Sequence, residues 1–135
     1  MRKPLSSVGF LVLLVGLGGS ITTPKAQAQK YLAPNYNHCA RPFYDPQSYN
    51  WYSVQNTCSF AIKVVLVAFS GDHGSGALDL GPGRHDGTGE TESEIRQHGG
   101  YDLYICPAGY TPVDANDEYI GAVNRPNTQF RCMRE

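Results

Sequence analysis

Histidines, carboxylates and serines are the side chains of this sequence that could carry acid–base or nucleophilic chemistry. His73 follows Asp72 and His85 precedes Asp86, so loop residues of this kind could form the site of a small hydrolase. However, no serine stands in a G-x-S-x-G nucleophile elbow, and no pair of histidines has the spacing of a zinc motif. We therefore expect no catalytic residue, no metal and no cofactor. A hydrolase that uses His73, His85 and Asp86 is the alternative.

Cysteines offer a second kind of chemistry, and the sequence holds four of them, Cys39, Cys58, Cys106 and Cys132. An even number of cysteines in an exported chain predicts two disulfides, and four cysteines allow three pairings. Cys39 and Cys58 flank an aromatic segment, whereas Cys106 and Cys132 end two strand-like runs that could lie side by side. The pairing 39–58 with 106–132 is therefore favoured.

Aromatic residues are the third group, with seven of them within the 22 residues from Tyr31 to Tyr52. They alternate with Asn, Gln and Asp, and flat rings beside amides and carboxylates bind sugars or anchor protein interfaces. Alternatively, the rings cover the ends of a small core, with Trp51 filling it. The candidate binding surface consists of Tyr36, Tyr44, Tyr49, Trp51 and Tyr52.

The first 28 residues have the pattern of a signal peptide. Arg2 and Lys3 precede the apolar run 8–17, and the small-x-small sequence 26–28 predicts cleavage after Ala28. The run is shorter than the roughly 20 residues that cross a bilayer, so we expect no transmembrane segment after signal removal. The predicted location is secreted or periplasmic.

The charge of the chain narrows the class of partner. Residues 29–135 hold eight basic and twelve acidic residues, a formal charge of −4. Nucleic acids and anionic membranes require a concentrated basic patch, which this composition does not provide. The expected partner is therefore an envelope protein or a glycan.

The elements that must position these side chains are mainly strands. Alternating or β-branched runs predict strands, and Thr91 with Glu94 has the capping-box spacing of one short helix, 92–98. Residues 29–50 have no period and are predicted to form an irregular aromatic-rich arm before a single β domain, 51–135. The expected fold is mainly β, a small antiparallel β-sandwich or open barrel with one short helix, stapled by disulfides. The predicted strands are 49–56, 61–69, 77–80, 101–106, 119–123 and 128–133.

Three short motifs suggest a family. An N-x-C run at 56–58, a P-G turn at 81–83 before the short helix, and a G-Y strand at 100–106 that ends in Cys follow one another in this order. The arrangement resembles small secreted bacterial disulfide-bonded β domains. This resemblance implies an exported, disulfide-bonded β domain and no catalytic residues.

Together these patterns predict a small exported protein with a non-catalytic binding or structural role at the cell envelope or outside the cell. Its rigid, disulfide-stapled surface would present the aromatic segment to a partner. The small envelope hydrolase and a carbohydrate-binding module that uses the aromatic segment are the alternatives.

Overall fold

The computed structural model of the chain describes residues 29–70 and 76–135. The predicted signal peptide, 1–28, lies outside the described residues, as do Asp72 and His73 of the hydrolase alternative. None of the helices in the described ranges has the length and hydropathy that a membrane crossing requires.

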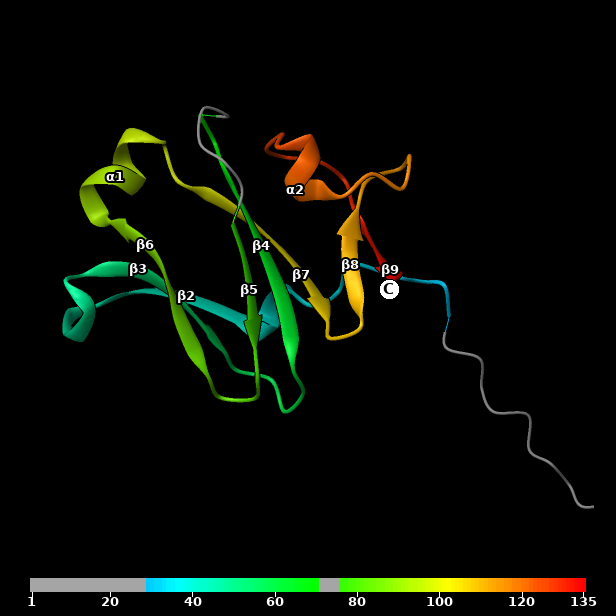
Figure 1. The fold of residues 1–135 in the computed structure, drawn as a ribbon, viewed down its shortest axis with the longest axis horizontal. Helices are drawn as coiled ribbons and strands as arrows, with labels where there is room; N and C mark the ends of the chain where they lie inside the picture. The colour runs from blue at the N-terminus through cyan, green and yellow to red at the C-terminus, as the bar shows by residue number, and fades with distance from the viewer. Residues whose placement is uncertain (1–28, 71–75) are drawn as a thin grey trace, which may run out of the picture.

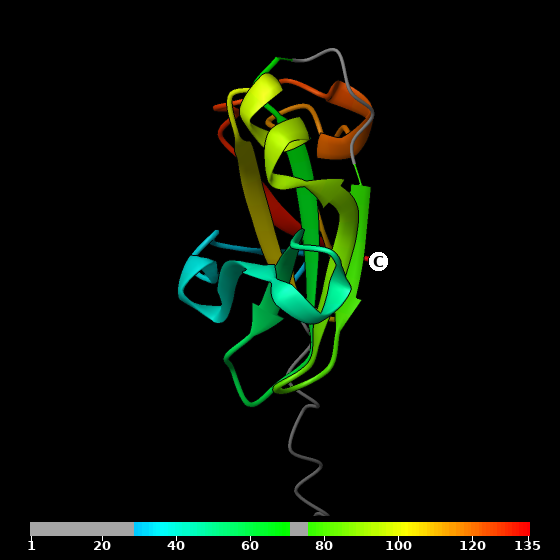
Figure 2. The ribbon, with the colours of Figure 1, turned by 90° about the vertical axis from the view of Figure 1, so that its left-hand side faces the viewer.

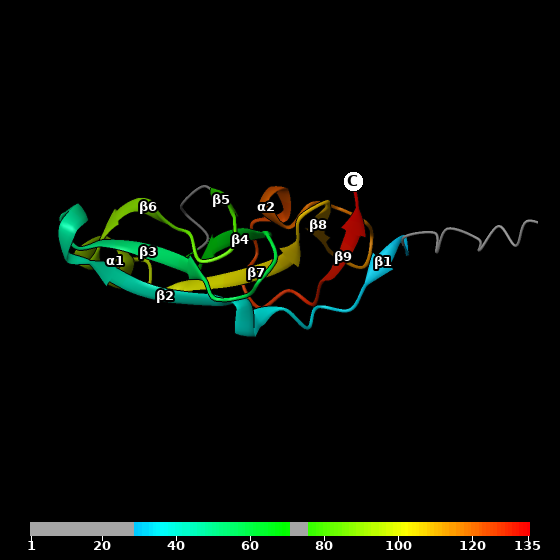
Figure 3. The ribbon, with the colours of Figure 1, turned by 90° about the horizontal axis from the view of Figure 1, so that it is seen from below.

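The fold is mainly β and consists of three small antiparallel sheets with two short helices (Figure 1). The sheets follow one another along the longest axis, and the view from below shows the same order (Figure 3). The first sheet has the order β2-β3-β6, with strands Ala40–Asp45, Trp51–Asn56 and His85–Thr91. The second has the order β5-β4-β7, with strands Gly76–Leu80, Ile62–Ala68 and Tyr101–Pro107. The third has the order β1-β9-β8, with strands Tyr31–Leu32, Arg131–Arg134 and Tyr110–Val113.

Strand β4 is the centre of the core, as its sequence predicts. Val64 faces the β2-β3-β6 sheet and packs in one buried cluster with Val54 of β3. Val65 faces the other way and packs with Tyr104 and with Ile120 of α2 (Ile120–Val123). Because β4 is apolar on both faces, it can be covered on both sides, and each buried aliphatic side chain stabilises the fold by roughly 1.5–3 kcal/mol.

Both predicted disulfides form with the favoured pairing. Cys39 bonds to Cys58 with their Cα atoms 5.0 Å apart, and Cys106 bonds to Cys132 with their Cα atoms 5.6 Å apart. The first bridge ties η1 (Asn37–Cys39) to the connection between β3 and β4, and the second joins β7 to β9. Each bridge restricts the unfolded chain and contributes about 3 kcal/mol of stability.

Asn56, at the end of β3, has a fully buried side chain with every polar atom bonded. Its Nδ2 donates to the carbonyl oxygens of Phe60, Leu80 and Gly81 at 2.7, 3.1 and 3.1 Å, and its Oδ1 accepts from the Cys58 amide at 2.9 Å. A single carboxamide thus links the end of β3, the connection into β4 and the end of β5.

The predicted helix is confirmed as α1 (Glu92–Gln97). Thr91 Oγ1 accepts from the Glu94 amide while the Glu94 carboxylate accepts from the Thr91 amide, which completes the capping box. Gly99, with φ of 74°, lies beyond the C-terminal end, and Ile95 is the buried residue of the helix. The cap and the one apolar contact define where this short helix begins and how it docks.

Several sequence predictions are corrected by the structure. Residues 29–50 are not an irregular arm, because β2 within them pairs with β3 over six residues. The predicted strand at 119–123 is instead α2, a second helix that ends at Asn124 in the left-handed conformation. Strands β6 and β8 were not predicted, because β6 lacks apolar residues and β8 contains Pro112. Such strands form because a partner strand satisfies their backbone groups.

The first strand, β1, is held by polar contacts. Tyr31 donates to Asp117 Oδ2 at 2.6 Å, Arg131 Nη2 donates to Asp117 Oδ1 at 2.7 Å, and the Arg131 guanidinium lies 3.8 Å from the Tyr31 ring centroid. The hydrogen bond from Tyr31, and then the one from Arg131, lowers the pKa of the Asp117 carboxyl.

The Asn56 contacts predict a large loss of stability on truncation. In Asn56→Ala, the carbonyl oxygens of Phe60, Leu80 and Gly81 lose the Nδ2 donor and the Cys58 amide loses its acceptor, so we expect the free energy of unfolding to fall by about 3 kcal/mol. The surface control Asn116→Ala should change it by less than about 0.5 kcal/mol. Urea unfolding measures both values, and equal stability of the two variants would contradict the role of Asn56.

The Asp117 contacts predict an acid-sensitive anchor for β1. Because folding lowers the pKa of this carboxyl, its stabilising effect is present above the unfolded-state value of about 3.9 and is lost as the pH falls through the lower folded-state value. The difference in melting temperature between the wild-type protein and Asp117→Asn should therefore shrink as the pH falls from 6 towards 2. A difference that stays constant over this range would show that the carboxylate charge contributes nothing.

Candidate functional site

One face of the β2-β3-β6 sheet points away from the core. Val54 of β3 is fully buried against the neighbouring sheet, so Trp51, Ser53 and Gln55 lie on the opposite face. Their cross-strand partners lie on that face too, because opposite residues share a side of the sheet. We call this side the aromatic face, and it consists of Arg41, Phe43, Asp45, Trp51, Ser53, Gln55, His85, Gly87 and Thr91. Figure 2 looks at the side of the molecule that carries this sheet and α1.

Trp51, the first residue of β3, has its side chain close to Ser53 and Gly87 on the aromatic face. A Cβ atom placed on Gly87 would be 3.4 Å from Cε3 of Trp51 and 3.4 Å from Oγ of Ser53. The indole therefore passes close over Gly87, and Ser53 is only 1% exposed on the same side. Trp51 itself keeps 37% of its surface exposed. The absence of a side chain at position 87 lets the indole approach the sheet closely, while part of the ring stays exposed.

A second ring pair extends the aromatic face along β2. The rings of Phe43 and His85 have centroids 5.6 Å apart and meet edge to face at 69°. The Arg41 guanidinium lies 6.0 Å from the Phe43 ring centroid, within the range of a weak cation–π contact. These contacts restrict the side chains, which lowers the entropy cost of binding a ligand on them.

Hydrogen-bonding groups lie between the rings. Arg41 Nη2 donates to Gln55 Oε1 at 2.6 Å, and Asp45 Oδ2 lies 3.6 Å from His85 Nε2. Among the described residues of the aromatic face, none is aliphatic. Its composition of rings with amide, carboxylate, imidazole and guanidinium groups is that of a surface for a flat, polar ligand.

The turn between β2 and β3 projects one more ring. Asp45 Oδ1 accepts from the Gln47 amide at 2.9 Å and so caps η2 (Pro46–Ser48), after which Tyr49 and Asn50 adopt φ of 54° and 55°. Tyr49 is 86% exposed, and its ring centroid lies 6.4 Å from that of Trp51. An aromatic residue in the left-handed region costs about 1 kcal/mol or more, and such strain collects at functional sites.

Beyond Tyr49, the surface continues into an open hollow of about 630 Å³ between the turn and α1. Asn50, Ser93, Arg96 and Gln97 contribute amide, hydroxyl and guanidinium groups to its wall. Arg96 is paired with a carboxylate on its own helix, because its Nη2 lies 2.6 Å from Oε1 of Glu92. The hollow therefore extends the aromatic face with polar groups and little net charge.

The structure separates the five aromatic residues that the sequence analysis proposed as one surface. Tyr49 and Trp51 lie together, whereas Tyr44 and Tyr52 pair on the core side of the same sheet with ring centroids 5.7 Å apart. Tyr36 packs against Phe60 and the first core cluster. Of the nine residues of the aromatic face, only Trp51 belongs to the binding surface predicted from the sequence, because β2 and β6 are not recognisable as strands in the sequence. Ser53 and Gln55 lie on the predicted strand 49–56, whose period-2 alternation places them on the same side as Trp51.

On the core side, Tyr52 stacks on Tyr101 with centroids 6.0 Å apart and planes 17° from parallel. Burial raises the pKa of the Tyr101 hydroxyl, and its hydrogen bond to Glu90 raises it further. Burial also raises the pKa of Tyr52. Both hydroxyls therefore stay protonated at neutral pH, and the two rings pack against the core cluster that contains Val54 and Val64.

The residues of the hydrolase alternative are not brought together in the described part of the chain. His85 faces Asp45, whereas Asp86 Oδ1 accepts the amide of Gly87. Ser70 Oγ lies 3.1 Å from His98 Nδ1, but the Ser70 amide also donates to the His98 carbonyl oxygen at 3.0 Å. This second pair therefore has a structural role, since it joins the end of β4 to the end of α1.

The strain at Tyr49 predicts that removing its side chain does not destabilise the fold. Tyr49→Gly removes the penalty of the left-handed conformation and exposes no core, so we expect the free energy of unfolding to stay constant or to rise by up to about 1 kcal/mol. Chemical denaturation gives this value. A loss of more than about 1 kcal/mol would mean that the Tyr49 side chain is held in place for the fold and not for a ligand.

Comparisons of the chain with protein-family models, with curated proteins and with solved structures find no match. A functional assignment must therefore come from the geometry of the chain itself. The feature that this geometry singles out is the aromatic face.

Proposed function

We propose that this is an exported, non-catalytic glycan-binding protein that holds a polysaccharide chain on the aromatic face. The observation that carries the proposal is the pair of exposed rings, Trp51 on the outward side of the sheet and Tyr49 in the adjoining turn, beside a face whose other side chains, apart from Phe43, are polar. The proposal takes up the carbohydrate-binding alternative of the sequence analysis.

The chemistry of sugars supports this choice. One side of a pyranose ring is a patch of C–H bonds that packs on an aromatic ring, and its edge carries hydroxyl groups that need planar donors and acceptors. Trp51 supplies the flat ring, and the Arg41–Gln55 and Asp45–His85 pairs supply donors and acceptors on either side. The hollow beyond Tyr49 gives a chain of several sugar units room to continue.

The same residues favour a glycan over a protein partner. Tyr, Trp and Arg also anchor protein interfaces, but the fully buried centre of such an interface is depleted of charged groups. Here Arg41 and Asp45 lie on the two sides of Phe43 within one strand, and aliphatic side chains are absent from the described aromatic face. The apolar centre of a protein partner would leave these charged groups without partners, whereas the hydroxyl groups of a glycan can donate to the carboxylate and accept from the guanidinium.

The covalent framework supports a location outside the cytoplasm. Two disulfides stabilise the domain, and disulfides persist in oxidising compartments. Together with the predicted signal peptide, this favours a secreted or periplasmic protein. The glycans within its reach are then those of the cell envelope or of the surroundings of the cell.

Trp51 provides a direct measurement of binding because it is the only tryptophan of the chain. We expect its fluorescence to change in a saturable way when soluble oligosaccharides are titrated into the protein. Chitohexaose, cellohexaose and soluble peptidoglycan strands are suitable probes, because they differ in their substituents but share a β-1,4-linked backbone. A signal that follows none of these probes, together with no retention on the corresponding insoluble polysaccharides, would contradict the proposal.

Two variants distinguish a role of the Trp51 ring in binding from a general effect of removing an exposed aromatic side chain. Trp51→Ala should weaken retention on the insoluble polysaccharide about tenfold, the loss expected for one stacking contact of about 1.4 kcal/mol. Phe60→Ala is the matched control, because Phe60 is 40% exposed and packs on Tyr36, away from the aromatic face. If both variants bind as the wild-type protein does, the aromatic face is not the binding site.

A further inference from the structure

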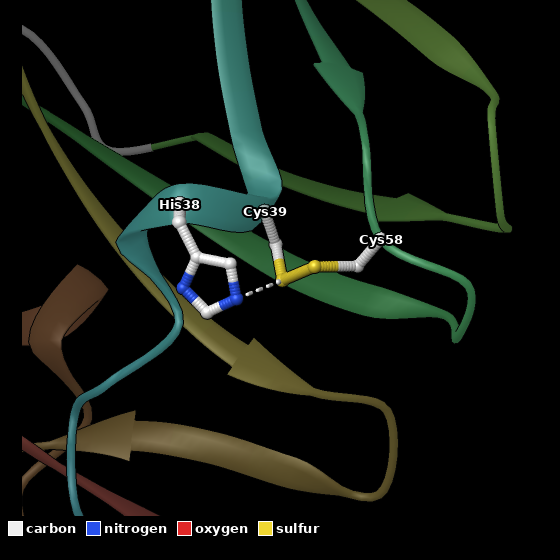
Figure 4. Close-up of side chains that lie close together, drawn as sticks. All are labelled: His38, Cys39 and Cys58. Atoms are coloured by element: carbon white, nitrogen blue, oxygen red, sulfur yellow. Dashed lines mark hydrogen bonds between the residues drawn. A yellow bond between two sulfur atoms is a disulfide. The ribbon is translucent and has the colours of Figure 1, made fainter.

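The Cys39–Cys58 bridge has an asymmetric environment. His38 Nε2 lies 3.6 Å from Sγ of Cys39, as the close-up in Figure 4 shows. Cys39 is fully buried, whereas Cys58 is partly exposed and His38 is exposed. The imidazole and the two sulfur atoms lie within 4.8 Å of one another. Because the sulfur atoms are bonded to each other, they are not free to act as metal ligands.

We propose that this bridge is a thiol–disulfide exchange site with a fixed direction of attack. An external thiolate, such as that of glutathione or of a protein dithiol, attacks Sγ of Cys58 and forms a mixed disulfide there. The bond between the two protein sulfur atoms breaks, and Cys39 leaves with the electron pair as a thiolate. A second external thiol releases Cys58 as the free thiol, and the external pair leaves as its own disulfide.

Two independent observations give the same direction. Exchange requires an approach to the attacked sulfur, and Cys58 is the partly exposed member of the pair. Exchange is also faster when the departing thiolate is stabilised, and the imidazole nitrogen 3.6 Å from Cys39 Sγ is placed to donate a hydrogen bond to it. The partly exposed cysteine and the favoured leaving group are thus at the two different ends of the bond.

The second bridge has neither feature. Cys106 and Cys132 are both fully buried, so an external thiolate has no approach to either sulfur. The Sγ of Cys132 faces the carbonyl oxygen of Ile105 at 3.6 Å, and the negative end of a carbonyl dipole disfavours a thiolate. The two bridges should therefore differ strongly in their rate of exchange.

Hydrogen bonds between the segments around Cys39 and Cys58 remain when the disulfide opens. The Thr57 amide donates to the Cys39 carbonyl oxygen at 2.8 Å, and Thr57 Oγ1 donates to the His38 carbonyl oxygen at 3.0 Å. Ala40 also pairs with Asn56 at the start of the β2–β3 ladder. These contacts keep the two sulfur atoms near each other after the bond breaks, so the bridge can form again.

Glutathione is the probe for a direct test on the oxidised protein. After incubation with reduced glutathione, the free thiols are alkylated and the modified peptides are identified by mass spectrometry. We expect glutathione on Cys58, the alkyl label on Cys39, and reduction of this bridge at least about tenfold faster than that of Cys106–Cys132. Glutathione found mainly on Cys39, or equal rates for the two bridges, would overturn the proposal.

The His38→Gln variant tests the imidazole as a positioning group. It should slow exchange about threefold or more through loss of the imidazole beside the leaving sulfur, while His98→Gln, in the turn after α1, should leave the rate unchanged. If the substitution only destabilised the fold, the exchange rate would rise and not fall, because a destabilised fold exposes the bridge to the external thiol. An unchanged or faster rate in His38→Gln would therefore count against the proposal.

Discussion

The buried carboxamide of Asn56 is the interaction on which the two packed sheets depend. It ends β3, and its four hydrogen bonds reach the turn before β4 and the end of β5, so it sets where the chain leaves one sheet and enters the next. The backbone repeats the link, since the Asn56 amide donates to the Arg84 carbonyl oxygen at 2.8 Å. A fully satisfied polar group in the core specifies one arrangement of these connections, because any other leaves the amide unpaired at a cost of several kcal/mol.

The disulfide beside Asn56 connects this arrangement to the surface. Cys39 directly precedes β2, an edge strand that carries a third of the aromatic face, and its bridge to Cys58 fixes the start of that strand. Three-stranded sheets of this size bury little surface on their own, so covalent ties supply part of the stability that a larger core would provide. The result is a rigid face, which is what a ligand with weak individual contacts requires.

Elements that are specified by residues close together in the sequence could be predicted. The apolar run of β4, the capping box of α1 and the spacing of the four cysteines each specify their structure through residues close in sequence. Strand β6 was not predictable, because its polar and glycine-rich sequence becomes a strand only when β3 pairs with it. In α2, the β-branched residues suggest a strand, but Ile120 fills the second core cluster and Asn124 ends the helix in the left-handed conformation. Tertiary packing outweighed propensity in both cases.

The composition of the aromatic face could be predicted from the sequence only in part. The sequence determined that rings concentrate before residue 53, that two disulfides form and that one strand is buried on both sides, because composition and spacing are sufficient for each. It did not determine which rings are exposed. Trp51 and Tyr52 are neighbours, and a shift of the strand by one residue would exchange their faces. The packing of Val54 against β4 fixed that register, so Trp51 points outwards with Phe43 and His85 while Tyr52 stacks on Tyr101 inside.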